Sequence, residues 1–318
     1  MRTTQALPMR INLFLASSFV ALLVFSVCGS RQAQAATPSA ETGATSTPQT
    51  AKIVTDDGGT LVAPALYELG IGLGAAYFPH YPGANQSKLY IMPFPFAIVR
   101  GRVLQSDRRG MRARLFTGKS FDISMSGAGA FPVKSGENKA REGMQDLGWI
   151  GQGGPKLRYE VTTFEDGGLL RLGFSVRMVV ASRKIFEIDH RGTVFEPELV
   201  YTRPNTFSDQ TDLYASLRTS FATRGLMSYY YHVGASEATA SRAAYDAQPG
   251  LLETTATFGL NIRSANNQHR WFVSTDLETI EGARNVDSPL VKSKWNASVA
   301  LAYIWTFYES KEKASVVY

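Results

Sequence analysis

Residues 170–178 read Leu-Arg-Leu-Gly-Phe-Ser-Val-Arg-Met, and an apolar side chain occupies every second position of this stretch. Successive side chains of a β-strand point to opposite faces of the sheet, so the segment has one apolar face and one face of arginine, glycine and serine. The same alternation runs through residues 67–77 and 295–307. A period of two predicts strands, because an amphipathic helix repeats its apolar positions every three or four residues.

Three features of these segments favour a membrane barrel over a soluble β-sandwich. Most of them run for about 10–13 residues, which is the length that a tilted strand needs to cross a bilayer. Aromatic residues such as Tyr67, Tyr77 and Trp305 lie at the ends of the apolar faces, where interfacial girdles are expected. The opposite faces carry charge and glycine, which suits a wet interior. The sequence therefore predicts an all-β fold, a transmembrane antiparallel β-barrel.

The number of segments and the lengths of their connections agree with this prediction. About 12 strands are expected, at residues 66–78, 88–99, 102–106, 111–117, 121–131, 155–164, 169–181, 194–203, 211–223, 251–263, 270–279 and 293–307. Connections alternate between mostly long and mostly short, so we expect short periplasmic turns and longer outer loops. Pro93 and Pro95 predict a bulge or a break in the second strand, because proline cannot donate a ladder hydrogen bond.

The beginning of the chain has the features of an export signal. Two arginines precede an apolar stretch at residues 11–27, and residues 33–35 read Ala-Gln-Ala, a small-x-small cleavage site. We expect residues 1–35 to be a signal peptide that is cleaved on export through the inner membrane. An uncleaved anchor and a lipoprotein modified at Cys28 are the alternatives. Cleavage removes the one cysteine, which excludes a disulfide scaffold and a cysteine nucleophile.

Three parts follow the signal peptide. Residues 36–62 are rich in Ala, Thr, Ser and Pro and predict a flexible N-terminal tether, residues 63–307 form the expected barrel, and residues 308–318 form a charged C-terminal tail. Residues 1–35 hold three of the 33 basic residues and no acid, so their removal lowers the formal charge from +6 to +3. A charge this small predicts no binding of nucleic acid.

Short motifs along the chain are similar to those of the MipA/OmpV family of outer-membrane proteins. They occur in order at residues 77–84 (YFPHYPGA), 93–95 (PFP), 140–147 (AREGMQDL), 154–155 (GP), 195–199 (FEPEL) and 287–291 (DSPLV). From these motifs we select the loop residues Pro79, Tyr81, Gly83, Arg141, Gly143, Met144, Asp287, Ser288 and Pro289. Family chains tend to end at an aromatic-x-Phe, which residues 305–307 resemble, whereas this chain continues to Tyr318.

The resemblance implies a non-catalytic scaffold in the outer membrane. The family's best-known member holds a lytic murein transglycosylase near a bifunctional penicillin-binding protein, so these two proteins are the partners that the resemblance implies. Such a scaffold links peptidoglycan enzymes to the outer membrane. Outer-membrane lipid and lipopolysaccharide are the further partners expected of a barrel at this location. The resemblance implies no cofactor.

Catalytic and metal sites find no support in the sequence. The four histidines, His80, His190, His232 and His269, are scattered, and no Ser or Asp lies at a spacing that demands pairing with them. No two histidines stand at i and i+2 on one strand, as a metal site on a strand would require. We expect no enzyme activity, no metal and no cofactor.

The polar faces of the strands carry charges of both signs into the expected lumen. The residues selected there are Arg112, Arg114, Arg158, Arg171, Arg177, Glu196, Glu198 and Arg218, with Lys156, Asp122, Glu160 and Asp212 among them. Ion pairs that brace a narrow interior would suit a scaffold, whereas a basic path for anions would make the protein a small porin-like diffusion channel. A 12-stranded barrel lies between the filled 8-stranded and the open 16–18-stranded barrels, so size leaves both alternatives open.

Overall fold

The computed structural model describes residues 52–54, 60–62, 65–99, 104–107, 110–117, 120–183 and 187–312. The expected signal peptide, most of the expected tether and residues 313–318 lie outside this part of the chain. Two short strands, β1 (Lys52–Val54) and β2 (Thr60–Val62), pair antiparallel within the segment expected to be a tether.

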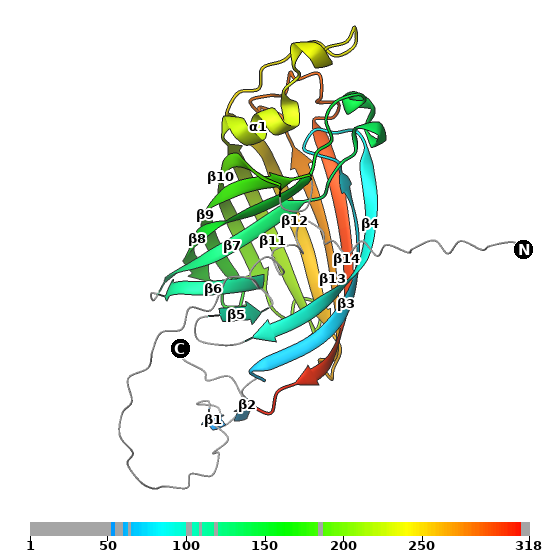
Figure 1. Cartoon of the computed structure of the whole chain (residues 1–318). Coiled ribbons are helices and arrows are strands. Elements are labelled where there is room, and N and C mark those ends of the chain that lie inside the picture. Colours follow the sequence, from blue (N-terminus) through cyan, green and yellow to red (C-terminus); the bar gives the residue numbers. More distant parts are fainter. Residues whose placement is uncertain are drawn as a thin grey trace, which may run out of the picture.

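Twelve further strands form one antiparallel sheet, which confirms the predicted fold class. They are β3 (Tyr67–Pro79), β4 (Ser87–Val99), β5 (Leu104–Asp107), β6 (Gly110–Thr117), β7 (Phe121–Ala130), β8 (Trp149–Thr163), β9 (Leu169–Ser182), β10 (Ile188–Arg203), β11 (Thr211–Ala222), β12 (Gly250–Arg263), β13 (His269–Thr279) and β14 (Trp295–Glu309). Their order is β4-β3-β14-β13-β12-β11-β10-β9-β8-β7-β6-β5, so the last strand pairs with β3 and the two edge strands are consecutive in the chain. The sheet curls accordingly (Figure 1).

Strand bounds differ from the predicted ones mainly at the end of the sheet that carries the long loops. β8 and β10 each begin six residues earlier than predicted, at Trp149 and Ile188, because both continue their ladders along β9 to Ser182. At the other end of the chain, β14 extends two residues into the expected tail, to Glu309. Apolar alternation is weak at these strand ends, so the pattern alone did not locate them.

The prediction of a bulge or break at the two prolines of β4 is wrong. β4 pairs with β3 in one unshifted register along its whole length. β4 stands first in the strand order, and an edge strand tolerates proline because the missing N–H falls on its unpaired side. Pro93 and Pro95 lie two residues apart, so both nitrogens face the same edge.

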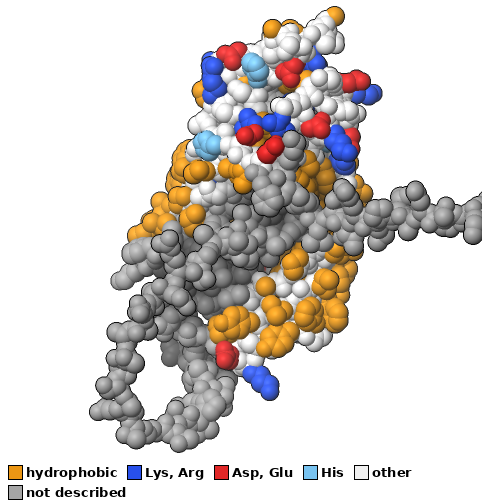
Figure 2. Space-filling view, viewed as in Figure 1, with side chains coloured by type: hydrophobic (Ala, Val, Ile, Leu, Met, Phe, Trp, Pro, Cys, Tyr) orange, Lys and Arg blue, Asp and Glu red, His pale blue; other side chains and the backbone are white. Residues whose placement is uncertain are grey.

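The two faces of the sheet differ sharply in the exposure of their side chains. On β9 the outward Leu172 and Met178 are 38% and 59% exposed, whereas the inward Arg171 and Arg177 are 5% and 7% exposed. Hydrophobic side chains cover the flank of the strands in the view of Figure 2, and charged ones gather at the end where α1 lies. An apolar belt of this kind is suited to lipid, since soluble monomers rarely expose large contiguous apolar patches.

The helices lie in the long connections. They are α1 (Arg224–Tyr231) and the short 3-10 turns η2 (Ser135–Glu137), η3 (Lys139–Arg141) and η4 (Ala235–Glu237). No helix in the described ranges is long and apolar enough to cross a membrane.

Candidate functional site

Four long connections pack together into one structure at one end of the sheet, which we call the cap. The cap comprises residues 80–86, 131–148, 223–249 and 280–294. Its core includes Leu226, Met227, Tyr230 and Tyr231 of α1, which are at most 6% exposed. These side chains pack against inward residues at the ends of five strands, namely Ile150, Val179, Ala181, Val194, Ala222 and Leu252. The cap therefore fills the interior of the curled sheet at this end.

The sequence of α1 explains its position. Leu226, Met227, Tyr230 and Tyr231 recur at a helical spacing and form one apolar face. The inner face of β9 changes along the strand from the charged Arg177 to the apolar Val179 and Ala181, and these two side chains pack in the same core as α1. The sequence pattern predicts an outer loop here and no helix, because a helix of eight residues depends on tertiary contacts for its stability.

The residues selected from the family motifs meet in the cap. The Tyr81 hydroxyl donates a hydrogen bond to the Leu290 carbonyl oxygen at 2.8 Å. The Arg141 guanidinium donates to the Tyr230 carbonyl oxygen at 3.0 Å, and its centre lies 5.8 Å from the Tyr81 ring centroid. The Ser288 hydroxyl donates to the backbone carbonyl of Tyr231 at 2.8 Å. Three motif segments are thus joined to α1 or to one another.

The remaining motif residues have different surroundings. Met144 is buried with Val233 and Leu290 in a second small cluster, and Pro79 is buried at the end of β3. Gly143 and Asp287 are exposed, and Pro289 lines a pocket that is described below.

Burial in the cap shifts the ionisation of several groups. Burial raises the pKa of Tyr81 to about 12, against a smaller lowering by the charge of Arg141. Burial also lowers the pKa of Arg141, and the nearby positive charge of Arg242 contributes to that lowering. The pKa of His80 is lowered, chiefly by burial, and its Nδ1 lies 3.0 Å from the Asn138 amide nitrogen.

Two motif glycines provide a matched test of how tightly the cap is packed. Gly83 and Gly143 both have positive φ, 85° and 79°, which costs an L-residue about 1–2 kcal/mol. A Cβ at Gly83 would lie 2.7 Å from Ile280 Cδ1, whereas a Cβ at Gly143 would meet nothing within 4 Å. We expect Gly83→Ala to increase hydrogen exchange of the cap amides clearly more than Gly143→Ala does. Equal effects would contradict this packing.

Six of the charged side chains selected for the lumen are described by the structure, and they lie on the inner face and form cross-strand ion pairs. Arg171 pairs with Glu160 at 3.3 Å, Arg158 with Asp122 at 3.5 Å, and Arg218 with Glu196 at 4.0 Å. Two closer pairs are Arg177 with Glu196 and Lys156 with Glu198. Arg112 and Arg114 belong to β6, but their side chains lie outside the described part of the chain.

Further charges of the inner face were not among the residues selected from the sequence. Glu68 of β3 pairs with Arg270 of β13 at 2.5 Å, and both are buried. Three more carboxylates, Glu253, Asp276 and Glu278, belong to β12 and β13. The period of two could have found the last two, because they alternate with the outward Leu277. These acids make the interior less basic than the selected residues alone suggest.

The four histidines lie in four different places. His80 precedes β4, His190 is in β10, His232 follows α1, and His269 begins β13. The His269 Nδ1 lies 2.7 Å from the Tyr303 hydroxyl, and His232 lies 3.8 Å from Asp246. Across the described ranges, no three His, Cys, Asp or Glu side chains are grouped closely enough to bind a metal ion.

Comparison with known proteins gives one family and several solved structures. The family model described as MltA-interacting protein MipA matches residues 71–307. Similar solved structures include the NanC porin, with 9% identity over 74% of this chain and 98% of that chain at a TM-score of 0.37. Another is Pseudomonas putida OprB, with 8% identity over 76% of this chain and 94% of that chain at a TM-score of 0.34. At these values neither structure bears on function. No curated protein sequence matches the chain.

Proposed function

Because the chain belongs to the family of MltA-interacting protein MipA, we propose that this outer-membrane β-barrel is a non-catalytic scaffold that holds murein enzymes at the membrane. Its partner is a lytic murein transglycosylase, and through it a bifunctional penicillin-binding protein. Residues 1–35 direct export and are cleaved, residues 36–62 tether the barrel, and lipid and lipopolysaccharide surround it.

The packed cap is the observation that carries this proposal. A diffusion channel needs a continuous wet path, whereas here the side chains of α1 fill one end of the interior with a close-packed apolar core. Tyr230 is 6% and Tyr231 2% exposed, so little space remains between α1 and the strands. A barrel closed in this way is suited to presenting a surface and not to passing solutes.

Ion pairing of the inner face supports the same function. Glu196 accepts hydrogen bonds from Ser220 at 3.0 Å and from Ser175 at 3.3 Å, in addition to its ion pair with Arg177. The ion pair between Glu196 and Arg177 links neighbouring strands. Because the carboxylate compensates the charge of the guanidinium, the pair attracts a passing anion only weakly.

The partner binds at the periplasmic end, on the short turns opposite the cap. Phe207, in the turn between β10 and β11, is 75% exposed, more than the other large hydrophobic side chains of the described residues. An aromatic residue in so exposed a turn can provide an anchor for a protein partner.

Site-specific photocrosslinking in intact cells tests the scaffold function. A photoreactive amino acid is placed at Phe207 in one variant and at Ala238, in the cap, in the matched control. We expect an adduct with a lytic murein transglycosylase at position 207 and none at 238, as identified by mass spectrometry. Further probes are placed at Asp166 and Asn267, in two other periplasmic turns. Adducts only at 238, or no murein enzyme at any of the three periplasmic positions, would contradict the proposal.

A further inference from the structure

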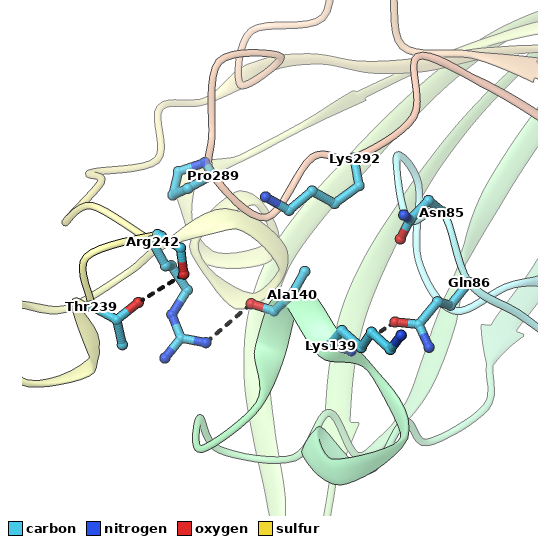
Figure 3. Close-up of a pocket in the computed structure, with 9 residues that line it drawn as sticks. Asn85, Gln86, Lys139, Ala140, Thr239, Arg242, Pro289 and Lys292 are labelled. Atoms are coloured by element: carbon cyan, nitrogen blue, oxygen red, sulfur yellow. Dashed lines mark hydrogen bonds between the residues drawn. The ribbon is translucent and has the colours of Figure 1, made fainter.

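A polar pocket of about 310 Å³ opens in the cap. Figure 3 shows it between the connections that follow β3, β7, β11 and β13. Its lining residues are Asn85, Gln86, Lys139, Ala140, Thr239, Ser241, Arg242, Pro289 and Lys292. This volume lies near the lower limit of pockets that bind small molecules.

Hydrogen bonds between the loops hold the pocket walls in place. The side-chain oxygen of Gln86 accepts from the Lys139 backbone at 2.7 Å, and its amide donates to the Glu137 carbonyl oxygen at 3.3 Å. Arg242, only 8% exposed, donates to the carbonyl oxygens of Ala140 at 3.1 Å and Glu142 at 2.9 Å. It also donates twice to the Glu237 carbonyl oxygen, at 3.1 and 2.7 Å. These hydrogen bonds join three of the four loops that line the pocket.

The lining is positively charged and contains no carboxylate. Lys139, Arg242 and Lys292 contribute three cations, and none of them forms an ion pair within the described part of the chain. The Arg242 partners are carbonyl oxygens, so no carboxylate is paired with its charge. Buried charges are normally paired, so an uncompensated guanidinium in a pocket wall favours an anionic occupant.

Three acidic side chains of the same loops have partners outside the pocket. Glu137 pairs with Lys88 at 2.6 Å. Asp146 accepts a hydrogen bond from the Ser135 backbone at 2.6 Å, and Glu237 from the Gly234 backbone at 3.1 Å. None of these three carboxylates forms an ion pair with Lys139 or Lys292 in the described part of the chain.

We propose that this pocket binds a phosphorylated sugar. Lys139 and Lys292 provide ammonium groups for the phosphate, since lysine is a common phosphate ligand. Lys292 extends across the space beside Pro289 in Figure 3. Asn85, Thr239 and Ser241 present an amide and hydroxyls for the sugar, and the Pro289 ring offers an apolar surface for its C–H face. This site goes beyond the scaffold function, and neither depends on the other.

Isothermal titration of the purified barrel in detergent with glucose 6-phosphate and with glucose tests this proposal. We expect glucose to bind at least about tenfold more weakly, because a lost charged hydrogen bond changes affinity by that much. Lys139→Gln combined with Lys292→Gln should weaken glucose 6-phosphate binding by a similar factor. Lys134→Gln combined with Lys294→Gln is the control, since both lysines are exposed and lie outside the lining.

The proposal is overturned if glucose 6-phosphate does not bind, if glucose binds equally well, or if the two double variants behave alike. Heat-modifiable gel migration verifies that each variant is folded. Two sources can supply the sugar, and nanodiscs separate them. The barrel is placed in nanodiscs that contain lipopolysaccharide with either a phosphorylated or a dephosphorylated core, and glucose 6-phosphate binding is measured in both. If the membrane is the source, the phosphorylated core should block binding of glucose 6-phosphate. If the ligand is soluble, glucose 6-phosphate should bind equally well in the two discs.

Discussion

Leu301→Lys is expected to prevent most of the protein from assembling into a heat-resistant barrel. Leu301 lies in the middle of β14, is 44% exposed on the outer face, and stands between Val273 and Ala75 in the sheet. A lysine near the bilayer midplane of a barrel costs roughly 2–4 kcal/mol. The folded fraction, read from gel migration before and after heating, and the urea midpoint in lipid vesicles measure this loss.

Ser298→Lys is the matched control for Leu301→Lys. Ser298 is on the inner face of the same strand and stands directly opposite Asp276 of β13. A lysine there faces a carboxylate and not lipid, so we expect assembly close to that of the unmodified protein. Equal losses in the two variants would mean that the outer face of β14 does not contact lipid.

Arg177→Glu is expected to have the second large effect, by placing two carboxylates together in the interior. Arg177 and Glu196 are both 7% exposed, so water cannot screen the charge that is left. Removing one partner of a buried ion pair costs about 3–5 kcal/mol. We expect a large drop in the urea midpoint and a partial recovery when Glu196→Arg is added.

Arg171→Glu is the comparison for this prediction. Arg171 is itself buried, but its partner Glu160 has 47% of its side chain exposed, so water can solvate and screen the carboxylate that loses its partner. The urea midpoint should therefore fall much less than for Arg177→Glu. Equal losses, or no recovery in the charge swap, would show that the Arg177–Glu196 pair does not brace the strands.

The sheet was predictable because most of its strands carry their own signal. β9 and β14 alternate over their full apolar length, and this local period determines which side chains face outward. β4 misled the analysis, because the effect of a proline depends on whether its strand lies at an edge, and strand order is not a local property. Partners of the inner charges likewise depend on register, which the sequence alone does not supply.

The cap was predictable only in part. Motif residues such as Tyr81, Arg141 and Ser288 were assigned to loops. The local sequence around them does not indicate that these loops meet at α1. The polar pocket of the cap takes residues from four connections that are up to about 200 positions apart, between Asn85 and Lys292. Contacts of such separation arise from the fold, so no motif could have revealed them.

Conductance of the purified, unmodified barrel in planar lipid bilayers tests the central claim, which is that the cap closes the interior. A variant in which residues 225–248 are replaced by a short Gly-Ser linker serves as the control, since it removes α1 and should open a conducting path. We expect steady channels from that variant and none from the unmodified protein. Robust, ion-selective channels from the unmodified protein would contradict the closed scaffold and favour a diffusion channel.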